Sequence, residues 1–360
     1  MQPVSTNYPY QNTTNILSIQ MMRGIACIIV VLFHISVKGA QYGNGALQGF
    51  SIGGAGVDMF FIISGYIMCV STVDRHLNFF QFSLLRIKRI IPLYWLTTTA
   101  ALVIYLYNPH IVNTSGGETS IWASYTLIPN GKKYLNSIGW TLSYEFFFYI
   151  IFALFINRGT YKAAVMSSIT LLILVVIGLF ANNDRPVLNF STHILYIEFV
   201  IGMCCFYLIN KKIVRLDPKL GVALTIVGTA ILGLELFFNM PVQDEWRGLT
   251  WGIPMLLIFV GLLSFEEFIQ RSNTLIRNLF LEIGNSSYSL YLIHPFTLSG
   301  TAMCLKALNM TSNPYFFAAI LFVVSVSLGH LVYLYVEKPL IALMKRKPAL
   351  QSIPKQQPIQ

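Results

Sequence analysis

Apolar runs of helical length, separated by short polar segments, fill almost all of the sequence between Ile16 and Val336. A run of about 20 apolar residues is long enough to cross a bilayer as an α-helix. The pattern therefore predicts an all-α fold, a polytopic membrane bundle of about ten transmembrane helices. They are expected near residues 16–37, 51–72, 90–107, 138–157, 163–181, 188–209, 219–239, 247–264, 286–307 and 314–336.

Basic residues are concentrated in every second loop of this bundle. Of the 24 Lys and Arg residues, 17 follow the even-numbered helices or lie in the C-terminal tail, 6 lie in the alternate loops, and Arg23 lies within the first helix. Because cytoplasmic loops carry the excess of Lys and Arg, we expect both termini in the cytoplasm. The net charge of +10 then reflects topology. We expect no nucleic-acid partner, since these residues form no single basic patch, whereas anionic lipid headgroups or an anionic cytosolic cofactor fit such loops.

The composition leaves little room for anything but a membrane domain, because 55% of the residues are hydrophobic and only 11% are charged. We expect a cytoplasmic N-terminal segment at 1–15, which does not resemble a signal peptide, a membrane domain at 16–339, and a basic, proline-containing cytoplasmic tail at 340–360. The outer connection at 108–137 is expected to cap the outer face. All 5 cysteines lie in apolar segments without a metal-binding spacing, so we interpret them as packing residues and predict no metal site.

Arg23 and His34 lie in the first long apolar stretch, where the bilayer disfavours both. Along an α-helix they are about 16 Å apart and only about 20° apart around its axis, so they share one face. A charged side chain at bilayer depth normally faces the protein interior or a watery cavity. The pair is therefore a candidate functional feature, and polarity used only for helix packing is the alternative.

Two carboxylates are predicted to lie at the depth of His34. Asp58 is early on the second predicted helix and Glu145 is early on the fourth, so both are expected in the outer half, with Arg23 in the inner half. An imidazole can take a proton from a hydroxyl, and a nearby carboxylate can orient it. The alternatives are a structural histidine bonded to a carbonyl, and packing pairs for the two acids.

Other polar groups occupy the ends of three helices. Arg86 and Arg89 precede the third predicted helix, where guanidinium groups suit phosphates, although an ordinary topological anchor is the alternative. Ser143 opens the fourth helix. Tyr291 and His294 share a face of the ninth, and His294 precedes Pro295, where freed backbone groups need partners.

Taken together, these motifs resemble those of membrane acyltransferase family 3. The motifs are Arg23-x10-His34, Gly56-Val57-Asp58-Met59-Phe60-Phe61, Ser64-Gly65, Arg86-x-x-Arg89-x-x-Pro92 and Ser286-x-Tyr288-Ser289-x-Tyr291-x-x-His294. Their order and spacing make the combination specific over roughly residues 17–339. The sequence is most similar to single-domain O-acetyltransferases of bacterial exopolysaccharides, and no appended extracytoplasmic hydrolase-like domain is visible.

The resemblance implies an enzyme of the plasma membrane, the bacterial inner membrane, that transfers an acyl group from cytosolic acyl-CoA, usually acetyl-CoA, to a sugar hydroxyl of a glycan. In this interpretation Arg86 and Arg89 hold the phosphates and Arg23 lies along the pantetheine arm. His34 is the general base, supported by Asp58 or Glu145, and an acyl-His34 intermediate is left open. Ser143 and Tyr291 are candidate oxyanion donors, with His294 at the substrate.

The expected partners are therefore acyl-CoA, a glycan acceptor and the lipid bilayer, and a homo-oligomer is left open. Two rival functions remain at this stage. One is a proton-coupled transporter or flippase of a glycolipid, for which intramembrane charges would form a relay. The other is a non-catalytic sensor or assembly subunit.

Overall fold

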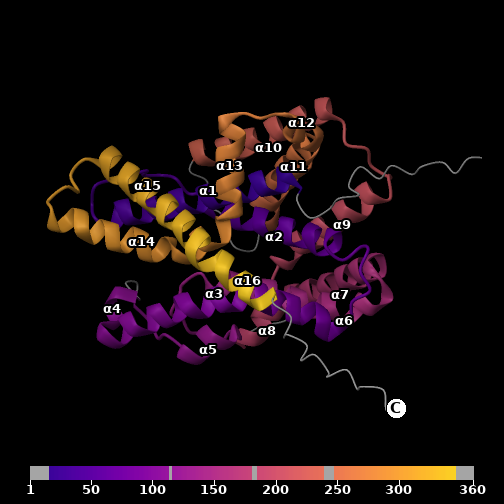
Figure 1. The fold of residues 1–360 in the computed structure, drawn as a ribbon, viewed down its shortest axis with the longest axis horizontal. Helices are drawn as coiled ribbons and strands as arrows, with labels where there is room; N and C mark the ends of the chain where they lie inside the picture. Colours follow the sequence, from indigo (N-terminus) through magenta and orange to yellow (C-terminus); the bar gives the residue numbers. More distant parts are fainter. Residues whose placement is uncertain (1–15, 113–115, 181–184, 239–246, 346–360) are drawn as a thin grey trace, which may run out of the picture.

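The computed structural model describes residues 16–112, 116–180, 185–238 and 247–345 (Figure 1). Every regular element in these ranges is helical, and no strand is present in them. The predicted all-α class is therefore confirmed. The predicted N-terminal segment 1–15 and residues 346–360 of the predicted tail lie outside the described residues.

Each of the ten predicted helices has a counterpart in the structure. The main helices are α1 (Leu17–Gln41), α2 (Gly53–Val70), α3 (Phe79–Tyr107), α6 (Gly139–Phe155), α7 (Thr160–Phe180), α9 (Tyr196–Asn210), α10 (Pro218–Phe238), α11 (Ile253–Leu263), α14 (Ser287–Ala307) and α15 (Pro314–Val332). Shorter helices are α4 (Pro109–Val112), α5 (Ile121–Thr126), α8 (Pro186–Ser191), α12 (Glu266–Arg271), α13 (Leu275–Asn285) and α16 (Lys338–Lys345).

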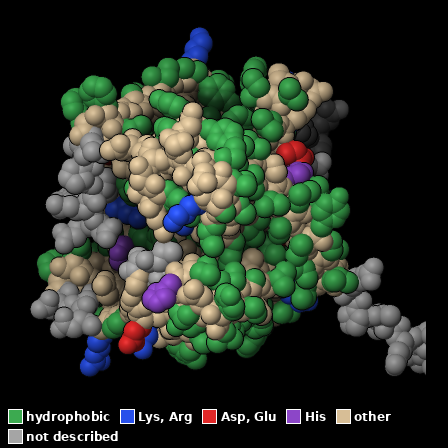
Figure 2. Space-filling model, turned by 90° about the vertical axis from the view of Figure 1, so that its left-hand side faces the viewer, with side chains coloured by type: hydrophobic (Ala, Val, Ile, Leu, Met, Phe, Trp, Pro, Cys, Tyr) green, Lys and Arg blue, Asp and Glu red, His purple; other side chains and the backbone are tan. Residues whose placement is uncertain are grey.

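Eight helical segments of the described chain are long and apolar enough to cross a membrane. Within that part of the chain α11 forms part of a shorter apolar helix, and α14 is not among the eight although it has 21 residues. Polar residues such as Ser287, Ser289 and His294 lower the hydropathy of α14. Hydrophobic side chains cover much of the face shown in Figure 2, with few charged side chains among them. The chain is thus a multi-helix membrane protein, and the count of ten spans and the orientation of the termini stay predictions.

Helices α1 and α2 lie between two groups of helices in Figure 1, with α10 to α13 on one side and α3 to α8 on the other. Glycines permit the close contacts of α2 with its neighbours. A Cβ atom on Gly56 would lie 2.5 Å from the Ala26 carbonyl oxygen of α1, and one on Gly65 would lie 2.2 Å from the Phe199 carbonyl oxygen of α9. Both distances are sterically forbidden, so these positions require glycine for backbone to approach backbone.

The start of α1 is capped by a residue from the far end of the sequence. The backbone N–H groups of Leu17 and Ser18 donate to the two carboxylate oxygens of Glu266, at 2.9 and 2.7 Å. The first N–H groups of a helix have no partner within it, and a carboxylate is favourable there. Glu266 therefore fixes the end of α1 from which Arg23 projects.

The third predicted helix begins earlier than expected, because α3 starts at Phe79 rather than near residue 90. Asn78 accepts a hydrogen bond from the Gln81 N–H, and the Gln81 side chain accepts one from the Asn78 N–H. This reciprocal capping box is a strong start signal for a helix. As a result Arg86 and Arg89 lie three apart on a helix and share a face, instead of lying in a loop.

Helical structure continues past residue 340, where the predicted tail begins, and that domain boundary stays a prediction. The π-helical turn Tyr333–Glu337 leads directly into α16, so the chain stays helical to Lys345 despite Pro339. A π turn shifts the pattern of backbone hydrogen bonds by one residue, so the helix can continue although Pro339 has no N–H to donate. Ile16 before α1 and Met344 in α16 line the same cavity.

The predicted outer connection enters the bundle instead of only covering it. The Tyr94 hydroxyl of α3 donates to the Ser124 carbonyl at 2.6 Å, and the Asn136 amide donates to the Leu292 carbonyl of α14 at 3.2 Å. These bonds hold the connection between α3 and α14. Because the connection lies deep, the helix that follows it, α6, also begins deep.

Candidate functional site

A cavity of about 850 Å³ lies among α1, α2, α3, α6, α14 and the α15–α16 segment. It reaches the surface beside the exposed residues Arg75, Lys88 and Arg89. At its inner end it is lined by Phe60, Thr141 and Tyr291. Small-molecule sites in proteins commonly occupy about 300–1,000 Å³. The cavity therefore has the volume of a ligand site.

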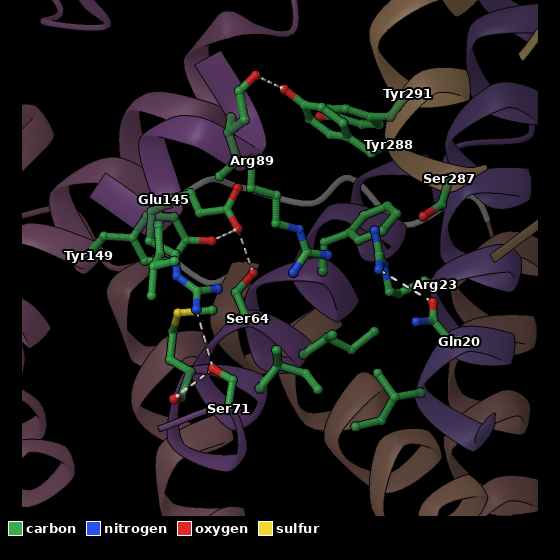
Figure 3. Close-up of a pocket in the computed structure, with 18 of the residues that line it drawn as sticks. Gln20, Arg23, Ser64, Ser71, Arg89, Glu145, Tyr149, Ser287, Tyr288 and Tyr291 are labelled. Atoms are coloured by element: carbon green, nitrogen blue, oxygen red, sulfur yellow. Dashed lines mark hydrogen bonds between the residues drawn. The ribbon is translucent and has the colours of Figure 1, made fainter. Parts of the chain in front are cut away.

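The three predicted cofactor-binding arginines all line this cavity. Figure 3 shows the guanidinium groups of Arg23 and Arg89 directed into the same space. Arg23 donates to the Gln20 side chain at 3.3 Å, and Arg86 donates to the Ser71 hydroxyl at 3.4 Å. Among the described residues none of the three arginines forms an ion pair.

The cavity is electropositive, because its walls carry more cationic than acidic side chains. The cations are Arg23, Arg75, Arg86, Lys88 and Arg89, and the acids are Asp74, Glu145 and Glu337. Arg86 is almost fully buried, and its Nε has no partner in the described structure. Buried guanidinium donors without a carboxylate partner favour an anionic ligand, and they recognise phosphate oxygens well.

Glu145 lies in this cavity and not beside His34, so its predicted location was wrong. Its carboxylate accepts a 2.8 Å hydrogen bond from the Ser64 hydroxyl and a second hydrogen bond from the Tyr149 hydroxyl (Figure 3). Glu145 is in the second turn of α6, whereas Ser64 is in the fourth turn of α2. Helix α6 therefore begins about 7 Å deeper than α2, which moves Glu145 toward the arginines.

Asp58 is likewise not a partner of His34. It is completely buried and forms an ion pair with Arg247, with Nη2 2.9 Å from Oδ2. Arg247 Nε lies 3.2 Å from the other carboxylate oxygen, and Nη2 also donates to the Gly54 carbonyl. The guanidinium lies over the Trp251 ring at 4.9 Å. The Asp58 carboxylate is thus engaged in joining α2 to the segment before α11.

His34 instead contacts His294, which the sequence placed at the substrate. Their ring centroids are 4.9 Å apart with an interplanar angle of 45°. The described residues give His34 no hydrogen bond or ion pair. The second neighbouring ring is Phe33, at 5.2 Å. Two residues expected on separate parts of the site therefore form one pair between α1 and α14.

Tyr291 connects the cavity to this histidine pair. Its hydroxyl lies 3.0 Å from the Thr141 hydroxyl at the inner end of the cavity. Its backbone carbonyl lies 2.8 Å from Nδ1 of His294, and the two rings are 5.7 Å apart. Neither histidine is among the lining residues, so Tyr291 stands between the space and the imidazoles.

Ser143, predicted as an oxyanion donor, lies away from the cavity lining. Its hydroxyl is 2.8 Å from the Tyr134 hydroxyl and also donates to the Gly139 carbonyl. Burial raises the pKa of Tyr134, which belongs to the outer connection. Ser143 thus ties that connection to the start of α6. Of the two candidate oxyanion donors, Tyr291 is the one that reaches the cavity.

Several cavity residues were missed by the sequence interpretation. Glu337 is buried and accepts a 2.5 Å hydrogen bond from the Ser289 hydroxyl. Tyr149 and Tyr288 line the space as well, and the Tyr288 hydroxyl donates to the Ile90 carbonyl. For Tyr149 the sequence held a local signal, because it follows Glu145 by four residues and so lies on the same helix face.

Among the described residues no cluster of three His, Cys, Asp or Glu side chains suits a metal ion.

The described chain is thus a helical membrane domain with an electropositive cavity, and Tyr291 separates this cavity from His34 and the buried His294. The family model of acyltransferase family 3, described as an acyltransferase domain, matches residues 16–333. The chain therefore belongs to this family, which confirms the resemblance inferred from its motifs.

The curated relatives include an exopolysaccharide production protein and O-acetyltransferases. The chain is 31% identical over 328 residues to the "Exopolysaccharide production protein ExoZ" of Rhizobium meliloti (strain 1021), covering 86% of this chain and 94% of that protein. It is 26% identical to the "Putative peptidoglycan O-acetyltransferase YrhL" of Bacillus subtilis (strain 168), covering 89% of this chain and 54% of that protein.

A further relative is the "O-acetyltransferase OatA" of Staphylococcus aureus (strain NCTC 8325 / PS 47), at 24% identity over 76% of this chain and 49% of that protein. The chain thus spans about half the length of OatA and YrhL, but nearly all of ExoZ. No solved structure matches the chain.

Proposed function

We propose that this protein is an integral membrane O-acetyltransferase that uses cytosolic acetyl-CoA to acetylate a sugar hydroxyl of an exported polysaccharide or its lipid-linked precursor. The observation that carries the proposal is a cavity whose three arginines form no ion pair with any described residue, and which leads through Tyr291 to His294 and His34. Membership of the acyltransferase 3 family and the similarity to ExoZ support this reaction class.

Acetyl-CoA fits the chemistry of the cavity as a donor substrate. Its phosphates suit Arg86 and Arg89 at the surface end, and its pantetheine arm would extend past Arg23 along α1. Arg23 and His34 are about 16 Å apart along that helix, which is of the order of the reach of such an arm. The proposed entry side is the cytoplasmic face, because Arg75, Lys88 and Arg89 lie at the mouth of the cavity and belong to a segment with an excess of basic residues.

The proposed chemistry is direct transfer with His34 as the general base. His34 takes the proton of the acceptor hydroxyl, the hydroxyl oxygen bonds to the thioester carbonyl carbon, and the C–S bond breaks as its electron pair goes to sulfur. The CoA thiolate then receives the proton from His34 and leaves as the thiol. The Tyr291 hydroxyl is the candidate donor to the oxyanion.

Reconstitution tests the function directly. Purified protein in lipid nanodiscs is supplied with acetyl-labelled acetyl-CoA and with polysaccharide prepared from a strain that lacks the gene. The proposal predicts label in the glycan and release of free CoA. Absence of both acetyl-CoA binding and transfer to any glycan would contradict it and favour a transport or non-catalytic role. NMR of O-acetyl signals in surface glycans, with and without the gene, would identify the acceptor.

A further inference from the structure

Pro295 creates an unusual hydrogen-bonding position on α14. In an α-helix the N–H of residue 295 would donate to the carbonyl of residue 291, but proline has no N–H. The Tyr291 carbonyl therefore lacks its helical donor, and the Nδ1 atom of His294 lies 2.8 Å from it. The sequence Tyr291-x-x-His294-Pro295 thus supplies both the free carbonyl and the side chain that occupies it.

This contact fixes the tautomer of His294. A carbonyl oxygen only accepts hydrogen bonds, so Nδ1 carries the hydrogen and Nε2 of the neutral ring carries the lone pair. His294 is completely buried, and no described residue donates to its Nε2. Buried acceptors normally have a donor, so this nitrogen is an exception that requires a function or a partner.

The side chain best placed to supply that donor is His34. Its ring centroid lies 4.9 Å from that of His294, so a hydrogen bond forms when the two rings turn a His34 nitrogen and Nε2 toward each other. The two carboxylates that were expected to orient His34 are engaged elsewhere, Asp58 with Arg247 and Glu145 with Ser64. His294 therefore occupies the position in which an orienting group for His34 is expected.

We propose that His294 is a positioning residue for His34: its Nε2 atom accepts the ring N–H of His34 and so leaves the second His34 nitrogen unprotonated toward the reacting hydroxyl. This inference rests on the proposed acetyl transfer. When His34 takes the hydroxyl proton, its ring becomes positively charged and donates more strongly to Nε2 of His294. The proton then passes from His34 to the CoA thiolate, and His294 exchanges no proton in the cycle.

The arrangement resembles the way a carboxylate orients the histidine of a hydrolase triad, but with a neutral imidazole in place of the charge. Because the site is buried, an additional carboxylate would carry a large desolvation cost. A neutral acceptor fixed by a backbone carbonyl provides the orientation without that charge. Both histidines and Pro295 then form one structural arrangement between α1 and α14.

Two amide variants of His294 separate positioning from packing. His294→Gln places an amide oxygen near the original Nε2 and can still accept from His34. His294→Asn keeps a donor near Nδ1 for the Tyr291 carbonyl but has no acceptor at Nε2. The two variants have the same functional group and differ in its reach. His110→Gln on α4, whose side chain is exposed, is the matched control for removal of a histidine.

The measurements are kcat and the KM for acetyl-CoA in nanodiscs, together with acetyl-CoA binding and the thermal unfolding temperature. We expect His294→Asn to lower kcat by about 100-fold, His294→Gln to stay within about 10-fold of the native protein, and both KM values to be unchanged. Equal kcat for Asn and Gln, or native kcat for Asn, would overturn the inference.

If the Asn variant does not fold, Pro295→Ala gives the second test, because it restores the competing backbone donor to Tyr291. A fall in kcat at unchanged KM supports the inference, and unchanged kcat overturns it. A native protein that binds acetyl-CoA without transferring acetyl to any glycan would instead reject the proposed function itself. The two failures are therefore distinguishable.

Discussion

Asp58 and Arg247 are 189 positions apart in the chain and form a buried ion pair between α2 and the segment before α11. Breaking a buried pair leaves an uncompensated charge and costs about 3–5 kcal/mol. We expect Arg247→Gln to lower the thermal unfolding temperature of the detergent-solubilised protein by several degrees. Arg271→Gln is the control, because its pair with Glu267 is exposed on both sides. Equal unfolding temperatures of the two variants would show that the buried pair does not hold these helices.

The arginines on α3 provide a prediction about donor binding. Arg86→Gln and Arg89→Gln should each raise the KM for acetyl-CoA by about 10-fold, because a charged hydrogen bond to phosphate is lost in the ground state. The kcat at saturating donor should change much less. Lys132→Gln, at an exposed ion pair of the outer connection, is the matched removal of a cation. An unchanged KM in both arginine variants would refute the phosphate assignment.

Glu145 is expected to weaken the binding of acetyl-CoA in the donor cavity. Glu145→Gln keeps groups that can bond to Ser64 and Tyr149 but removes a negative charge from a cavity meant for an anion. We therefore expect acetyl-CoA to bind a few-fold more tightly in a direct binding assay. Unchanged affinity combined with a collapse of kcat would restore the original prediction that this carboxylate supports His34.

Replacement of Pro295 by alanine should lower activity without lowering stability. Alanine is about 3 kcal/mol more favourable than proline inside a helix, so Pro295→Ala should raise the unfolding temperature or leave it unchanged. Its restored N–H competes with His294 for the Tyr291 carbonyl, so kcat should fall several-fold. Both quantities are measured on one preparation. A lower unfolding temperature would indicate that Pro295 itself contributes to the packing of α14 instead.

Much of this architecture could be predicted from the sequence because bilayer length and hydrophobicity constrain helices strongly. The positions of Arg23, Arg86 and Arg89 on one cavity followed from topology and motif order. The partner of Asp58 could not be predicted, because no local spacing relates it to Arg247. The depth of Glu145 within the bundle was predicted wrongly, since the position of a residue along its helix does not show how deep that helix begins. The capping box at Asn78 is a local signal for the start of α3, and the predicted start near residue 90 did not take it into account.

The central claim is that acetyl transfer from acetyl-CoA takes place with His34 as the base. The most direct measurement compares native protein with His34→Ala in nanodiscs, with labelled acetyl-CoA and de-O-acetylated glycan, and follows donor binding and transfer separately. The account predicts that the variant inserts and binds acetyl-CoA with native affinity, while transfer falls by at least about 100-fold. Near-native transfer by His34→Ala would contradict it.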